Sequence, residues 1–383
     1  MASRRLRVSG TTAAVVLVSV VAIAEPAAAR PEPTLRQTPH ALAVAAFERM
    51  SKAERVGQLF MAGVPSNGVS SSELAFLHRH AIGDVILNNN TTHRRHVIHV
   101  LSKRLRQRML VARVAPFIST DQEGGLVQRL AGPGFARIPS ALTQGRYRTT
   151  TLRADATSWG GQLAQAGVDL DLAPVADVVP ARNAHANQPI GRYDREYGHT
   201  PAVVGPHVAA FTRGMTAAGV ATTLKHFPGL GRASGNTDTQ RHVTDPTTRH
   251  DAYLKPFAAG IDAGAQFVMV SSATYPHIDR SRPACFSATI IGNMLRGDLH
   301  FDGVVISDDL GTSALSKAPL GRRATRFVKA GGTMLLDTSP GQLPAMIRAV
   351  KAKMSANRGF KRQVKAAVLI NLETKAANGL VTS

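Results

Sequence analysis

The 383-residue sequence contains one cysteine, Cys285, so it can form neither an intramolecular disulfide nor a metal site made of cysteine thiolates. Only 5% of the residues are aromatic, and they do not alternate with basic residues in the way that base stacking requires. Acidic residues are scarce as well. The 25 Asp and Glu against 46 Lys and Arg give a formal net charge of +21, which favours anionic partners such as nucleic acid, lipid headgroups or cell-wall polymers.

Several common motifs are also missing. The sequence has no HExxH, and no predicted strand carries His-x-His, so a catalytic metal has little support. We therefore expect no metal site. The basic residues are densest at 103–108, 322–326 and 361–365, each within a helix-like pattern. Such patterns are more typical of solvated helix faces than of a specific nucleic-acid surface.

A signal peptide is predicted at residues 1–29. Arginines among residues 4–7 precede an apolar stretch at 11–24, which is too short to span a membrane comfortably. Small residues up to Ala29 offer a cleavage site. We expect cleavage after Ala29 and a secreted, extracellular protein without a membrane span, exported by either the Sec or the twin-arginine route. An uncleaved N-terminal anchor is the alternative.

The rest of the chain alternates short apolar runs with helical patterns. Most of the runs are continuously apolar, which is typical of parallel strands that helices bury on both faces. The strands are predicted at 56–64, 82–88, 115–121, 169–177, 219–226, 266–272, 303–309 and 332–337. Helices are predicted between them at 93–110, 153–166, 201–218 and 251–264, and after the last strand at 341–355.

This alternation predicts a fold of the α/β class, a (β/α)8 TIM-type barrel. We expect a single domain over residues 41–383, preceded by a Pro-rich linker at 30–40 and closed by C-terminal helices. A doubly wound sheet is the alternative, but no GxGxxG motif follows the first predicted strand.

Polar side chains follow the predicted strands at the point where each strand ends. They are Asp121 with Glu123, Asp177, Lys225 with His226, Ser271 with Ser272, and Asp308 with Asp309. Because barrel strands end on one rim, these side chains are expected to share an active site. Capping of the following helix remains the alternative for Asp177 and Asp309.

The residue types at this rim indicate carbohydrate chemistry. A carboxylate held rigidly by a buried strand, as Asp308 is, can attack an anomeric carbon or stabilise an oxocarbenium ion. The remaining candidates for holding sugar hydroxyls are Asp121, Arg129, Arg195, Lys225 and His226.

The sequence resembles glycoside hydrolase family 3, in its single-barrel β-N-acetylglucosaminidase branch, over most of residues 45–340. The motifs that carry the resemblance are DQEGGLVQR at 121–129, LAPVADV at 172–178, IGRYDREYG at 190–198, KHFPGLG at 225–231 and VVISDDLG at 304–311. It implies a retaining hydrolase for terminal β-linked N-acetylglucosamine, without a cofactor. It further implies that Asp308 is the nucleophile and that the sugar is held by Asp121, Arg129, Arg195, Lys225 and His226.

The chain departs from the family where the family carries Asp-Ser-His, whose His is the general acid/base. One register places Asp238-Thr239-Gln240 there, and the other, without an insertion, places Asn236-Thr237-Asp238. Neither register supplies the His. Either Asp238 acts as the acid, or His242 takes the role with Asp238 orienting it, or catalysis is lost.

Two functions therefore stay open. The first is an exported glycoside hydrolase that acts on peptidoglycan fragments or chitin-type oligosaccharides. The second is a secreted sugar- or wall-binding barrel with weak or no turnover. In both cases the positive charge predicts an electrostatic association with anionic cell-wall polymers as a secondary property.

Overall fold

A computed structural model describes residues 2, 7, 9–11, 14–16 and 38–383. Most of the predicted signal peptide and residues 30–37 of the predicted linker lie outside the described residues. Thr38 caps helix α1 (Pro39–Arg49), so the chain is already helical within the last residues of that linker. In the described part of the chain, no helix combines the length and apolarity that a membrane crossing requires.

Eight parallel strands form the sheet that was predicted. They are β1 (Phe60–Pro65), β2 (Asp84–Asn88), β3 (Ile118–Thr120), β6 (Leu170–Asp171), β7 (Ala221–Phe227), β8 (Phe267–Val270), β11 (Val304–Ser307) and β12 (Leu335–Asp337). Adjacent strands are hydrogen-bonded in the order β11-β8-β7-β6-β3-β2-β1-β12. A parallel bridge between Ile306 and Met334, supported by hydrogen bonds from Thr333 and Met334 to Val305, joins the two ends. The sheet is thus a (β/α)8 barrel.

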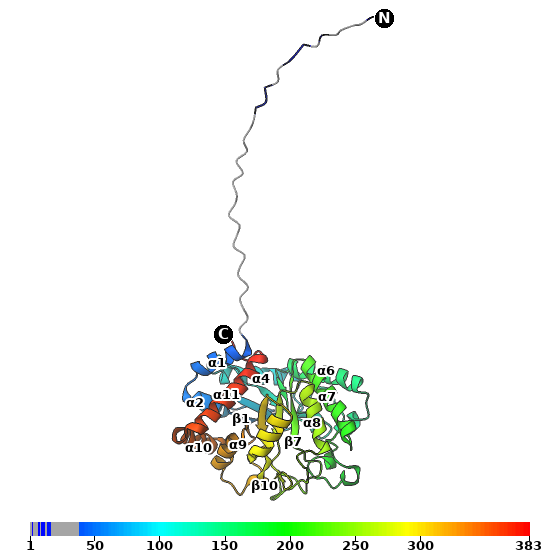
Figure 1. The fold of residues 1–383 in the computed structure, drawn as a ribbon. Coiled ribbons are helices and arrows are strands. Elements are labelled where there is room, and N and C mark those ends of the chain that lie inside the picture. Colours follow the sequence, from blue (N-terminus) through cyan, green and yellow to red (C-terminus); the bar gives the residue numbers. More distant parts are fainter. Residues whose placement is uncertain (1, 3–6, 8, 12–13, 17–37) are drawn as a thin grey trace. The chain divides into compact units, whose positions relative to one another are not determined.

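Helices surround the sheet, as Figure 1 shows. Those that connect or follow the strands are α3 (Ser71–Arg79), α4 (Arg95–Met109), α6 (Thr149–Gln165), α7 (Pro201–Ala217), α8 (Lys255–Asp262), η5 (Thr289–Asp298), α9 (Leu320–Ala330), α10 (Leu343–Ala356) and α11 (Arg358–Ala377). Two short hairpins, β4 (Gln122–Gly124) with β5 (Val127–Gln128) and β9 (Thr274–Tyr275) with β10 (Asp279–Pro283), extend two of the loops.

The first strand begins later than predicted. Residues 56 and 57 belong to helix α2 (Lys52–Gly57), and β1 starts at Phe60. The Ser51 hydroxyl accepts from the Glu54 backbone N–H, while the Glu54 side chain accepts from the Ser51 backbone N–H. This capping box stabilises the helix start, so the apolar residues that follow finish a helix before the strand begins.

Two apolar clusters hold the barrel together. The larger lies between the sheet and the helices, and the smaller fills the barrel interior with side chains such as Phe117, Phe267 and Met334. Lys375 of α11 is fully buried and lies 3.0 Å from Asp84, next to Gln58 and Gly83. Side chains therefore fill the barrel interior, and the space for a ligand lies at the rim formed by the carboxyl ends of the strands.

Candidate active site

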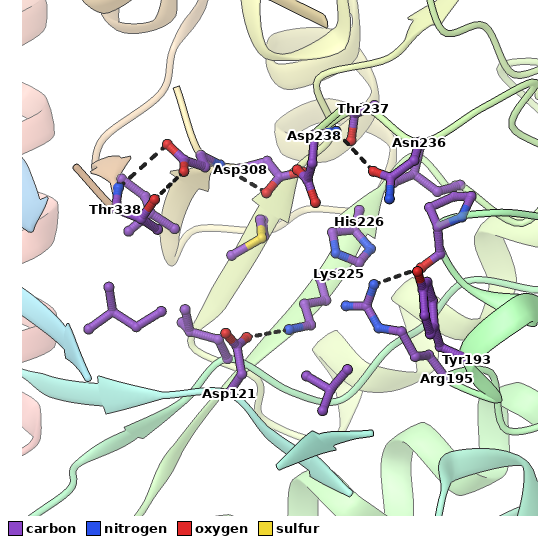
Figure 2. A pocket seen from close by; sticks show the side chains of 18 of the residues that line it. Asp121, Tyr193, Arg195, Lys225, His226, Asn236, Thr237, Asp238, Asp308 and Thr338 are labelled. Carbon is purple, nitrogen blue, oxygen red and sulfur yellow. Dashed lines mark hydrogen bonds and ion pairs between the residues drawn. The ribbon is translucent and has the colours of Figure 1, made fainter. Parts of the chain in front are cut away.

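A polar cavity of about 470 Å³ opens at the carboxyl ends of the barrel strands. Its labelled side chains come from separate loops and point toward a common space (Figure 2). Most residues predicted for the site line it: Asp121, Arg129, Arg195, Lys225, His226, Asp238, Asp308 and Asp309. The other strand-end residues expected there, Glu123, Asp177, Ser271 and Ser272, do not line the cavity. Interior residues Ile86, Leu172, Met269 and Leu336 form an apolar floor under these charges.

The centre of one side of the cavity is a buried network of charges. Lys225 Nζ lies 2.7 Å from Asp121 Oδ1 and 2.6 Å from Glu123 Oε1. Arg195 donates two hydrogen bonds to Glu123, of 2.8 and 2.7 Å. Burial alone would raise the pKa of Glu123, but the two cations outweigh burial and hold that pKa far below its usual range. The network is therefore ionised and rigid.

Glu123, which follows β3 in the DQEGG motif, was expected at the site from its position at a strand end beside Asp121, but no role was predicted for it. Its side chain is only 3% exposed and does not line the cavity. Its carboxylate contacts Lys225 and Arg195, and it holds both in position toward the cavity.

Further contacts fix the side chains of Arg129 and Arg195. Arg129 Nε lies 3.8 Å from Asp121 Oδ2, and its Nη1 donates to Asn90 Oδ1 at 3.0 Å. Arg195 Nη1 donates to the Pro189 carbonyl at 2.8 Å, as Figure 2 shows. Their guanidinium groups therefore face the cavity in fixed orientations, which suits them to bind hydroxyls.

Strand β7 delivers two consecutive side chains to the cavity. The pairing of β7 with β8 is irregular between Leu224 and Phe227, which allows Lys225 and His226 to face the same space. Asp177 fixes the second of them. It accepts from His226 Nδ1 at 2.8 Å, from the His226 backbone N–H at 3.2 Å and from the Leu230 N–H at 2.8 Å.

Asp177 therefore does not cap a helix, which was the alternative considered for it. Its carboxylate is fully buried and shapes the turn after β7. With Nδ1 directed at this carboxylate, the Nε2 atom of His226 is the ring nitrogen left for a ligand.

Asp308 follows β11 and stands across the cavity from the charge network. Its backbone N–H donates to Val270, and its Oδ1 accepts from the Asp309 N–H at 2.9 Å. Burial raises its pKa to about 6; His226 opposes this rise and the nearby Asp238 adds to it. The Asp309 carboxylate has different partners, because it accepts from Thr338 Oγ1 and from the Gly311 N–H.

Asp238 lies on the loop that sequence comparison left in two registers. Asn236, Thr237 and Asp238 all line the cavity, and the Asp238 backbone N–H donates to Asn236 Oδ1 at 2.9 Å. Figure 2 shows the Asp238 side chain beside Asp308 and above His226. Asp238 is exposed within the open cavity. Partial desolvation by the cavity walls raises its pKa, His226 and Arg195 oppose the rise, and Asp309 and Asp121 add to it.

Two other residues lie elsewhere: Gln240, which the register with an insertion places at this position, and His242, the other candidate for the acid. Gln240 is exposed and donates to Gln188 at 3.0 Å, and it does not line the cavity. His242 lines a separate hollow with Arg280 and Lys317. The geometry thus favours the register without an insertion, in which Asp238 stands where the family motif has its His.

The structure offers no obvious cation site in the part of the chain that it describes: no group of three His, Cys, Asp or Glu side chains is arranged to hold a metal. Two apolar side chains at the cavity mouth were not predicted as functional. Leu126 is 70% exposed and Tyr193 is 38% exposed, and both line the cavity.

Comparisons with known proteins agree with this geometry. Residues 52–369 match the family described as Glycosyl hydrolase family 3 N terminal domain. A Beta-hexosaminidase of Xanthomonas campestris pv. campestris is 33% identical over 305 residues, which cover 77% of this chain and 88% of that protein. A Beta-hexosaminidase of Xanthomonas oryzae pv. oryzae is 31% identical over 331 residues, covering 84% and 93%.

Solved structures are similar as well. The crystal structure of a Beta-N-acetylhexosaminidase from Beutenbergia cavernae has a TM-score of 0.83 and 42% identity, covering 85% of this chain and 98% of that one. A family 3 beta-N-acetylglucosaminidase from Paenibacillus has a TM-score of 0.78 and 28% identity, covering 87% of this chain and 64% of that one.

Proposed function

Since the chain belongs to glycoside hydrolase family 3 and is a hydrolase of the β-hexosaminidase type, we propose that it removes terminal β-linked N-acetylglucosamine with retention, using Asp308 as nucleophile and Asp238 as general acid/base. The observation that carries this assignment is the pair of carboxylates in one cavity, with Asp308 on β11 and Asp238 on the facing loop. Retaining hydrolysis needs a nucleophile and a proton donor.

The first step forms a covalent intermediate. The sugar is held by Asp121, Arg129, Arg195, Lys225 and His226. Ionised Asp308 attacks the anomeric carbon, and the bond from that carbon to the glycosidic oxygen breaks. Protonated Asp238 gives its proton to the departing oxygen, so the leaving group departs as a neutral alcohol.

The second step releases the sugar. Asp238, now ionised, takes a proton from a water molecule, whose oxygen attacks the anomeric carbon as the bond to Asp308 breaks. Asp308 returns to its carboxylate form and Asp238 to its acid form. Two inversions at one carbon leave the product with the original β configuration.

The electrostatics of the two carboxylates support these opposite roles. A charge on Asp308 disfavours a second charge on Asp238, because like charges in a partly desolvated site repel each other. The titrations of the two carboxylates are therefore linked. One carboxylate charged and one protonated is the combination that the first step needs.

The test of the nucleophile is turnover of p-nitrophenyl N-acetyl-β-glucosaminide by the wild-type protein and by Asp308→Asn. A loss on the order of 10³-fold or more is expected, since the covalent route is removed. A mechanism-based 5-fluoro derivative of N-acetylglucosaminyl fluoride, which keeps the 2-acetamido group, should label the Asp308 peptide in a mass spectrum. Equal rates for the two proteins, or a label on another residue, would exclude Asp308.

A sugar-binding barrel without turnover is the second candidate function. It is favoured by one observation: the loop of Asp238 brings no histidine into the cavity, and His226 is held by Asp177. Rates on a natural disaccharide separate the two candidates. Turnover at ordinary enzyme rates supports the hydrolase, and binding without turnover supports the second candidate.

We further propose peptidoglycan fragments or chitin-type oligosaccharides as substrates and a secreted protein that associates with anionic cell-wall polymers. The N-terminal sequence and the net charge of +21 support this setting. Release of free N-acetylglucosamine from each class of oligosaccharide, and fractionation of the producing cells, test the two parts separately.

A further inference from the structure

Outside the active site, one part of the surface is rich in positive charge, with Asp279 as its only acidic partner within the described residues. Three neighbouring hollows of about 280, 290 and 530 Å³ lie along it. Arg282 and Arg326 line both the first and the second hollow, and Lys329 lines both the second and the third. Because they share lining residues, the three hollows lie next to one another and mark one path over the surface.

We call this path the cationic track, and it is defined by Arg280, Arg282, Lys317, Arg326, Lys329, Lys353 and Arg362. None of its three hollows has an Asp or Glu in its lining. Within the described residues, the only ion pair of these side chains is that of Arg282 with Asp279, at 3.4 Å. All except Lys353 are exposed to solvent.

Several segments far apart in the sequence supply these cations. They come from β10, the loop before α9, and helices α9, α10 and α11, and Figure 1 shows these elements on one side of the barrel. The basic runs at 322–326 and 361–365 each contribute one residue, and their other cations point elsewhere. The basic runs that were expected to be only solvated helix faces thus also contribute to the cationic track.

The cations repel one another where they come close. Lys353 lies 4.8 Å from the ring of Phe360, and burial, together with the charge of Lys329, lowers its pKa. Bound anions would relieve that repulsion. The hydroxyl of Thr274 stands among the cations of the first hollow and adds a hydrogen-bond donor.

From this arrangement we infer that the cationic track binds a linear anionic polymer with regularly repeated phosphate or carboxylate groups, such as a polyol phosphate or an acidic polysaccharide. A path of neighbouring hollows fits a flexible chain better than a flat lipid surface. Nucleic acid fits less well, because the phenylalanines of the track, Phe286 and Phe360, are 5% and 2% exposed and offer no face for base stacking.

The track also begins beside the catalytic loop. His242, four residues after Asp238, lines its first hollow, and so does Ala314, whose N–H donates to the Thr237 carbonyl at 3.1 Å. A polymer in the track would thus run along the outer side of the loop that carries the proposed acid. This inference deepens the electrostatic association proposed above, and it would hold the enzyme on a wall polymer close to its sugar substrates.

The experiment compares two variants with the same net charge. The track variant carries Arg282→Gln, Arg326→Gln and Lys329→Gln. The control variant carries Arg94→Gln, Lys103→Gln and Arg108→Gln, which are exposed cations at and on α4. Affinities for poly(glycerol phosphate) and for polygalacturonate are measured from 50 to 300 mM salt, which separates the phosphate from the carboxylate source.

The track variant should bind the preferred polymer at least about tenfold more weakly at low salt, with a shallower salt dependence, and the control variant about as tightly as wild type. Arg282→Lys, Arg326→Lys and Lys329→Arg together should keep the affinity. Equal losses in the track and control variants would reduce the effect to net charge and overturn the inference. Tighter binding of an oligothymidylate of equal charge would overturn it too.

Thermal unfolding shows whether each variant is folded, independently of any catalysis. Hydrolysis of neutral p-nitrophenyl N-acetyl-β-glucosaminide should be unchanged in both variants, since none of these residues lines the active-site cavity. The two proposals therefore fail separately: loss of polymer binding leaves the hydrolase assignment intact, and absence of hydrolysis leaves the binding measurement valid.

Discussion

The backbone N–H of Asp238 donates a 2.9 Å hydrogen bond to the side-chain oxygen of Asn236. This contact turns the loop so that Asn236, Thr237 and Asp238 all reach the sugar cavity, and it leaves Gln240 outside. The family motif that the sequence resembles has an Asp at the first of these positions and a His at the third. Here an amide orients the backbone and a carboxylic acid takes the third position.

The first prediction concerns Asp238. Replacing it with Asn removes the proton donor, so kcat/KM for a chitin-type disaccharide should fall by about 10²–10⁴-fold. For a dinitrophenyl glycoside, whose leaving group needs no proton, kcat/KM should change little, because this parameter reports only the first step. Azide should accelerate the slow second step in this variant. A matched His242→Ala variant should retain wild-type rates on both substrates, and a loss there would return the acid role to His242.

The second prediction concerns pH. Asp308 attacks only when ionised, and burial raises its pKa to about 6. The charged fraction, and with it kcat/KM for the dinitrophenyl glycoside, should therefore decline as the pH falls below about 6. Because Asp238 contributes to that raised pKa, the decline should move to lower pH in Asp238→Asn. An unmoved acidic limb would show that the two carboxylates do not interact.

The third prediction concerns Glu123. Glu123→Gln leaves Lys225 and Arg195 without their shared carboxylate, and loss of one member of such a buried network costs about 3–5 kcal/mol of unfolding free energy. Urea unfolding at pH 7 should show this loss. Asp298→Asn breaks the exposed pair with Arg249 and should change little.

The same variant has a defined pH dependence. The pKa of Glu123 is lowered in the folded protein, so its stabilisation is complete above the unfolded pKa of about 4.3 and is lost as the pH falls toward the folded value. The difference between wild type and Glu123→Gln should therefore narrow below about pH 4. A difference that stayed constant into acid would mean that packing, and not charge, explains the loss.

The fourth prediction concerns Tyr193 and the leaving group. Its loop contacts the catalytic loop, since Gln240 donates to Gln188 at 3.0 Å, and its ring lines the cavity mouth. Tyr193→Ala should lower kcat/KM for a disaccharide by about 2–10-fold, the range expected for an aromatic contact. A methyl glycoside of the same sugar, which lacks the second ring, should be affected much less. Equal losses would place the ring against the sugar that is cleaved off.

Much of the fold could be read from the sequence because continuous apolar runs mark buried parallel strands. All eight strands lie within or close to their predicted ranges. The start of β1 was wrong because Val56 and Gly57 are apolar enough to belong to either element. The capping box of Ser51 and Glu54, which a closer reading could have used, decides in favour of a helix.

The site could be predicted only in part. Its positions at strand ends follow from barrel geometry, and that geometry brings the predicted residues together. The role of Glu123 depends on contacts with residues more than a hundred and about seventy positions away, which no local pattern shows. The register at Asp238 depended on where the loop turns, and a single sequence does not mark that turn.

The loop of Asp238 is hydrogen-bonded to the segment that follows Asp308, through the N–H groups of Ser313 and Ala314 and the carbonyls of Asp238 and Thr237. The proposed acid and the proposed nucleophile thus lie on two loops that are hydrogen-bonded to each other. An engineer who transplants a histidine-bearing loop into this barrel to change its leaving-group preference should transplant residues 312–315 with it. A graft of the first loop alone would break these hydrogen bonds and change the spacing between the two proposed catalytic groups.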